Sequence, residues 1–241
     1  SSTSFVPLAW EILSPMPFEI SEVAMGMYVS DDDGSIHLII NGFGGASSGK
    51  DVYDYDLSSN TWSLKKNRLC SGDHVSVETA LIRWNGVLKQ RVLNIGGLKS
   101  CEKDIHAYIS EEDEWVSIIK LPHDNGVASA STGVFKVNQT NVLIVSGGLA
   151  GDNSGTIVDT WSFDLDAFNN REEGEIIVEE QDDDDDDDDV SMLMLYWTKL
   201  SDMPDEGRNH QAAVGDGKRY LWTISGRGAI GGGFKNVSLK T

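Results

Sequence analysis

Hydrophobic residues along the chain gather in short runs that end at small residues. The clearest runs cover residues 38–40, 92–95 and 142–145, and a weaker one covers 220–224. Runs of this length, rich in β-branched and aliphatic residues and bounded by glycine, predict buried β-strands. Alternating segments such as 51–56 predict half-buried strands, and no stretch keeps the period of an amphipathic helix. The pattern therefore predicts an all-β protein.

Three sequence markers recur in a fixed order at an interval of about 50 residues. A glycine pair follows each clear hydrophobic run, at Gly44 and Gly45, Gly96 and Gly97, and Gly147 and Gly148. An aspartate opens each alternating segment, at Asp51, Asp104 and Asp159. A tryptophan follows, and the four copies are Trp10, Trp62, Trp115 and Trp197. We interpret the glycines as turn residues, because no helical pattern or Gly-Lys-Ser sequence follows them to bind phosphate.

The order of hydrophobic run, Gly-Gly, aspartate, aromatic residue and tryptophan resembles the kelch repeat. The resemblance spans nearly the whole chain and implies one domain, residues 1–241, with the fold of a kelch-type β-propeller. Each blade is then a four-stranded antiparallel sheet, whose first strands we expect at 24–29, 77–82, 132–137 and 211–214. Polar turns follow these strands. Because one such sheet cannot bury both faces alone, neighbouring sheets are expected to stack around an axis.

About four blades are visible in the sequence. Three repeats are complete, and a fourth is split between the two ends of the chain. Residues 10–13, paired beside residues 234–239, would complete a small ring. Kelch propellers more commonly have six or seven blades, and the residues before Trp10 lack the aspartate-aromatic pattern. We therefore favour an incomplete part of a larger ring over a closed four-bladed one.

The charge of the chain is strongly acidic, with a formal net charge of −20. Much of the excess lies in residues 168–190, which include eight consecutive aspartates from Asp182 to Asp189. Because adjacent carboxylates repel one another, we expect a disordered insertion there that binds cations or basic tails weakly. The acidic balance argues against binding to nucleic acid, and no apolar run is long enough to cross a membrane.

The cellular compartment is left open by the sequence. Two cysteines, Cys70 and Cys101, favour free thiols in the cytoplasm, and their pairing does not follow from their spacing. Two glycosylation acceptor triplets, which begin at Asn138 and Asn236, would suit a secreted chain.

Candidate catalytic residues are few. Glu102, Asp104 and His106 alternate and would share one strand face, where such a set can hold a metal. Asp104 nevertheless occupies the repeat position of Asp51 and Asp159, which favours packing and turn hydrogen bonds. The fourth repeat resembles those of galactose-oxidase-like kelch enzymes, but no copper constellation is recognisable, and the signature of iron-binding specifier propellers is missing. We expect no cofactor and no catalysis, with a metal-dependent oxidase-like or specifier-type enzyme as the alternative.

Binding to another protein is the favoured function. In kelch-like propellers, partner peptides commonly dock on the face formed by the turns between second and third strands and by the turns that lead into the next blade. On this chain, that face is predicted to carry several basic residues. The candidates are Arg68, Lys99, Lys103, Arg208, His210 and Arg227. We expect an acidic or phosphorylated peptide as the partner, since arginine binds such groups in a bidentate manner. A truncated propeller without independent function is the second alternative.

Overall fold

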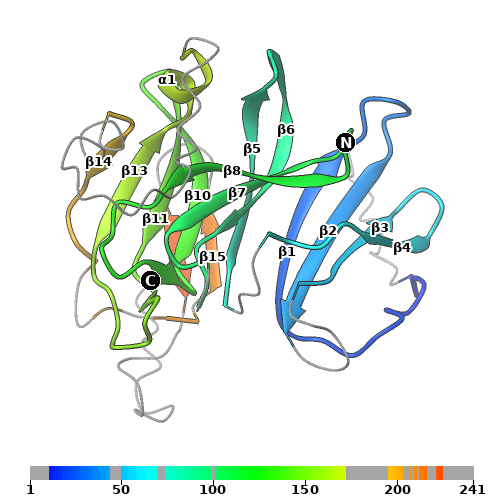
Figure 1. Cartoon of the computed structure of the whole chain (residues 1–241), viewed down its shortest axis with the longest axis horizontal. Helices are drawn as coiled ribbons and strands as arrows, with labels where there is room; N and C mark the ends of the chain where they lie inside the picture. The colour runs from blue at the N-terminus through cyan, green and yellow to red at the C-terminus, as the bar shows by residue number, and fades with distance from the viewer. Residues whose placement is uncertain are drawn as a thin grey trace, which may run out of the picture.

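The protein consists mainly of antiparallel β-sheets, as the sequence predicted. The computed structural model describes residues 11–43, 50–69, 74–98, 101–171, 195–203, 207, 209–210, 212–215 and 221–224. Three sheets have four strands each (Figure 1). The first contains β1 (Ser21–Val29), β2 (Ile36–Phe43), β3 (Val52–Asp56) and β4 (Thr61–Lys65). The second contains β5 (Ser76–Trp84), β6 (Val87–Ile95), β7 (Asp104–Ile109) and β8 (Glu114–Lys120). The third contains β10 (Ser131–Val137), β11 (Thr140–Ser146), β13 (Thr160–Asp164) and β14 (Trp197–Lys199).

Two smaller sheets and one short helix complete the described structure. A fourth sheet pairs β15 (Ala212–Gly215) with β16 (Leu221–Ile224), and β9 (Val127–Ala128) pairs with β12 (Leu149–Ala150). The helix α1 spans Leu165–Asn169. Within the described residues, no hydrogen-bonded ladder joins one four-stranded sheet to another.

The three large sheets repeat one strand order, in which each strand pairs with the next along the chain. Their first strands are β1, β5 and β10, which confirms the predicted positions within a few residues. A turn at Asn85 and Gly86 joins β5 to β6, where a polar turn was expected, and both residues have positive φ. Asn138 and Gln139 likewise have positive φ and join β10 to β11. Two-residue turns of this type match the twist of the strands they join.

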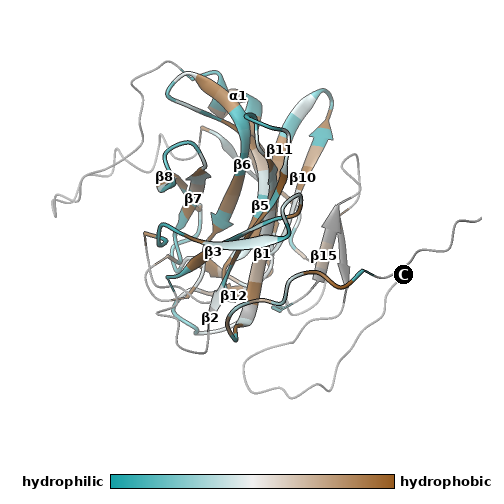
Figure 2. Ribbon diagram, turned by 90° about the vertical axis from the view of Figure 1, so that its right-hand side faces the viewer, coloured by the Kyte–Doolittle hydropathy of each residue, from teal (hydrophilic) through white to brown (hydrophobic). Residues whose placement is uncertain are grey.

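The second sheet buries both of its faces between its neighbours. On one side, Tyr108 and Trp115 pack with Ile39 and Val52 of the first sheet. The other side contributes to a larger core shared with the third sheet, which includes Ile105, Ile119, Leu143, Phe163 and Trp197. Hydrophobic residues accordingly lie mainly along the strands and hydrophilic ones at the turns (Figure 2). The second and third sheets therefore pack against their neighbours through equivalent residues. These are the tyrosine or phenylalanine of the third strand and the tryptophan of the fourth strand.

The first sheet has one apolar face that the described structure leaves partly open. On β1, the side chains of Val23, Met25, Met27 and Val29 all point to this face and are 43–54% exposed. The pairing of β1 with β2 and of β2 with β3 places them on the same face as Tyr55. In the second sheet, the corresponding face carries Tyr108, which is 1% exposed. We call the first group of four residues the open face.

Two of the three glycine pairs lie in the described residues, and they are required by close packing. Gly96 has a φ of +61°, and a Cβ atom there would lie 1.9 Å from the carbonyl oxygen of Val127. At Gly148, with a φ of +110°, a Cβ atom would lie 2.5 Å from the carbonyl oxygen of Ala128. Both pairs therefore allow one turn to pass against another, as the sequence predicted. Gly44 and Gly45 lie outside the described residues.

The first four residues of the predicted insertion, 168–171, belong to the described structure. Phe168 is fully buried and packs against Phe163, and Asn169 is 6% exposed. The side chain of Asp164 caps α1 by accepting a hydrogen bond from the Ala167 amide at 2.8 Å. Phe168 therefore belongs to the core that the second and third sheets share. The eight aspartates lie outside the described residues.

Cys101 is buried and disulfide-bonded, which differs from the expectation of free thiols. The sequence contains one other cysteine, Cys70, which lies outside the described residues. Because disulfides persist mainly in oxidising compartments, this bond favours the secreted alternative. No helix among the described residues is long and apolar enough to cross a membrane.

Candidate binding pocket

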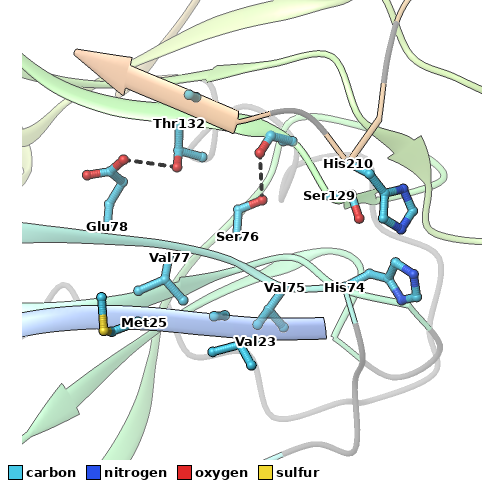
Figure 3. A pocket seen from close by; sticks show the side chains of 13 residues that line it. Val23, Met25, His74, Val75, Ser76, Val77, Glu78, Ser129, Thr132 and His210 are labelled. Carbon is cyan, nitrogen blue, oxygen red and sulfur yellow. Dashed lines mark hydrogen bonds between the residues drawn. The ribbon is translucent and has the colours of Figure 1, made fainter. Parts of the chain in front are cut away.

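A pocket of about 400 Å³ lies where the first strands of the three large sheets and of the β15–β16 sheet begin. Its wall is formed by Val23 and Met25 of β1 and by residues 74–78 at the start of β5 (Figure 3). Ser129, just before β10, and Thr132, within it, continue the wall, together with His210, just before β15, and Ala213, within it. These strand ends adjoin the turns that lead from one sheet into the next. We call this edge of the molecule the turn face, and it also carries the turns between second and third strands.

Three residues at equivalent places on the pocket rim share an unusual backbone conformation. His74, Ser129 and His210 each precede a first strand and have φ between 50° and 62°. Non-glycine residues in this left-handed region cost roughly 1–3 kcal/mol each and gather at functional sites. The rings of His74 and His210 lie 4.6 Å apart and nearly perpendicular. The rim thus repeats one local geometry across three sheets.

Hydrogen bonds between successive sheets fix the walls of the pocket. The Ser129 amide donates to the His74 carbonyl oxygen at 2.7 Å. The Ser76 hydroxyl donates to the carbonyl oxygen of Ala130 at 2.9 Å, and the Thr132 hydroxyl donates to Glu78 at 3.1 Å (Figure 3). The two hydroxyl groups are therefore engaged in holding the strands together.

Glu78 is the one carboxylate on the pocket wall among the described residues. Burial raises the pKa of its carboxyl above the usual range, and the hydrogen bond from Thr132 opposes this shift in part. No ion pair to a basic group forms at Glu78 within the described part of the chain. A carboxylate that is partly removed from water without a cation is a marker of binding sites.

The predicted binding residues are only partly brought together by the structure. His210 lines the pocket and Lys103 is exposed on the turn face. Arg68 is 3% exposed, so it is placed beneath the surface. Lys99, Arg208 and Arg227 lie outside the described residues.

The buried Arg68 affects the pKa of the neighbouring His106. The pKa of His106 is lowered to about 4, first by burial and second by the charge of Arg68. The side chain of His106 is 6% exposed. Because its pKa is far below 7, it is neutral at pH 7. The predicted alternation of Glu102, Asp104 and His106 is interrupted by a register shift between Ile105 and His106. The described residues contain no group of three or more histidine, cysteine, aspartate or glutamate side chains that could hold a metal ion.

The three described tryptophan markers occupy equivalent packing positions. Trp115 and Trp197 are 2% and 4% exposed, whereas Trp62 is half-buried. The Trp197 indole donates a hydrogen bond to the Lys120 carbonyl oxygen at 3.2 Å, and the Trp62 indole donates to that of Ser14 at 3.1 Å. These residues hold sheets and turns together.

Sequence reasoning missed Glu78, Thr132 and Met25 as pocket residues. The available signal was the alternation of Ser76, Glu78, Ala80 and Ile82, which places one acidic side chain next to the apolar part of a strand face. This signal did not predict the pocket, because the sequence of one strand does not show which residues of other strands its face contacts.

Comparison of the sequence with models of protein families and with curated proteins finds no match.

Proposed function

We propose that the chain is a kelch-type β-propeller, whole or in part, that binds a segment of another protein on its turn face without catalysing a reaction. The observation that carries this proposal is the pocket formed by the first strands of the three large sheets and of the β15–β16 sheet. Concave sites lined by apolar groups and a few polar ones are the usual binding sites of proteins. The repeat order supports the propeller, since three sheets share one strand order and stack through equivalent residues.

We propose that the part of the partner segment that lies on the rim of the turn face is acidic or phosphorylated. Of the basic residues that the sequence predicts there, Lys103 is exposed, and Lys99, Arg208 and Arg227 lie outside the described residues. Arg68 is left out of the contact set because its side chain is buried. The aspartates of the insertion are proposed to add weak binding of cations or basic tails.

The test is a peptide-array measurement on the full chain, with acidic, phosphoserine and basic peptides. Replacing Lys99, Lys103, Arg208 and Arg227 together by alanine is expected to weaken binding of acidic or phosphoserine peptides about tenfold or more. Lys136→Ala is the control, because Lys136 is exposed near the other end of β10. Equal binding by the fourfold variant and the unchanged chain would overturn the proposal, as would an equal loss in the control.

An incomplete ring is the second candidate, and the open face of the first sheet favours it. The corresponding face of the second sheet is covered by the first sheet, and that of the third sheet is covered by the second. The open face would be covered in the same way by a further sheet of the repeat. The chain would then act as one part of a larger propeller.

A further inference from the structure

The pocket combines an apolar entrance with a carboxylate on its wall. Val23 and Met25 are 53% and 54% exposed and lie on β1, whereas Glu78 projects from β5 toward Thr132 (Figure 3). None of the described residues that line the pocket is lysine or arginine. The formal charge of the wall therefore comes from Glu78, with histidines at the rim.

Glu78 has bonding capacity that the described structure leaves unused. A carboxylate offers sites for about four hydrogen bonds. Glu78 accepts one from the Thr132 hydroxyl and one from the backbone of Thr79. On the same strand face, Ala80 and Ile82 are 3% and 0% exposed, so Glu78 is placed at the border between core and pocket. An ionised carboxylate in such a place is stabilised by a cation more strongly than one in open water.

The shape and chemistry of the pocket suit a long side chain with a charged end. Lysine and arginine bury their methylene stems along apolar surface and keep a cation at the tip. Apolar residues of the same wall, among them Val77 and Ala130, offer such a surface, and Glu78 offers the counter-charge. A glutamate or phosphoserine side chain in the same place would meet the Glu78 carboxylate and be repelled.

We propose that the pocket receives a lysine or arginine side chain of the bound protein segment, with Glu78 as its counter-ion. This inference rests on the proposed function and deepens it, because it assigns opposite charges to two parts of the bound segment. A basic residue enters the pocket, and acidic or phosphorylated residues lie against the cations of the surrounding turn face.

The inference is tested by nuclear magnetic resonance on the full chain with short probe peptides. The probes are acetyl-Gly-Gly-Lys-Gly-Gly-amide, the same peptide with uncharged norleucine for lysine, and one with glutamate for lysine. The lysine peptide is expected to shift the resonances of Met25, Ser76 and Thr132, and neither of the other two peptides should do so. The variant Glu78→Gln is expected to bind the lysine peptide about tenfold more weakly or not at all.

Glu112→Gln is the matched control, because it removes the same charge from an exposed turn between β7 and β8. This control is expected to bind like the unchanged chain. Equal shifts with the norleucine peptide, or unchanged affinity in Glu78→Gln, would overturn the inference. A phosphoserine peptide is measured in parallel. If it shifts Lys103 while no lysine peptide shifts the pocket, the inference fails and the proposed function stands. If no peptide shifts any resonance of the turn face, both fail.

Discussion

Gly96 shows at the scale of one residue how closely the turns of the second sheet pack. The Gly96 amide donates to the Asp104 carbonyl oxygen, while the Val127 carbonyl oxygen occupies the space where a side chain would begin. Gly148 is placed in the same way against Ala128. The glycine pairs could be read from the sequence because their role is local. The backbone that each pair approaches is distant in the chain and is known only from the structure.

Replacing Gly96 by alanine is expected to lower the free energy of unfolding by about 3 kcal/mol. The positive φ strains any L-residue, and the added Cβ would collide with backbone rather than with a movable side chain. Urea denaturation measures the effect. Gly155→Ala is the control, because no atom lies within 4 Å of a Cβ built there. Similar losses in the two variants would contradict this account.

His106 gives the protein a pH-dependent stability. Its pKa in the folded state is about 4, below the usual 6.5, so the unfolded chain binds more protons between these two values. The free energy of unfolding should therefore fall as the pH drops from about 6.5 to about 4, by roughly 1–3 kcal/mol from this residue alone. The measurement is urea denaturation over this range for the unchanged chain and for His106→Gln. Parallel pH profiles of the two proteins would show that His106 does not contribute.

At the scale of elements, the strands were predictable and the helix was not. Runs such as 92–95 identified the second strands because burial on both faces leaves a continuous apolar signal. Helix α1 has five residues, too few for a helical period, and acidic residues follow it closely. Its place in the core depends on contacts between Phe168 and Phe163 and between Asn169 and Leu81, which sequence spacing does not reveal. The pocket was missed for the same reason, since four strands far apart in sequence form it.

Phe168→Ala is expected to destabilise the protein by roughly 3–5 kcal/mol, because it leaves a cavity in the core of the third sheet. A disordered insertion starting at residue 168 would instead tolerate this change. Thermal unfolding followed by circular dichroism distinguishes the two. Leu195→Ala is the control at the other end of the insertion, since Leu195 is 72% exposed, and a change within about 0.5 kcal/mol is expected there.

At the scale of the whole molecule, the second and third sheets present the same face to the sheet that precedes them. The tyrosine or phenylalanine and the tryptophan of the second and third sheets are covered by the sheet that precedes each in the chain. The sequence predicted the stacking, because each sheet has two apolar faces. It did not show which faces meet, since that depends on the register of strands in different sheets. The directional order leaves the first sheet's open face as the surface where a preceding sheet would pack.

The open face leads to a prediction about the mass of the protein in solution. Val23, Met25, Met27 and Val29 form a continuous apolar stripe on β1, and exposed patches of this kind mark contact surfaces. We expect the full chain to associate as its concentration rises, so that light scattering gives a mass above 26.3 kDa. The variant Met27→Ser with Val29→Thr should associate less, whereas Leu88→Ser, on β6 and 42% exposed, should behave like the unchanged chain. A constant monomer mass at every concentration would contradict this prediction and favour a chain that is complete by itself.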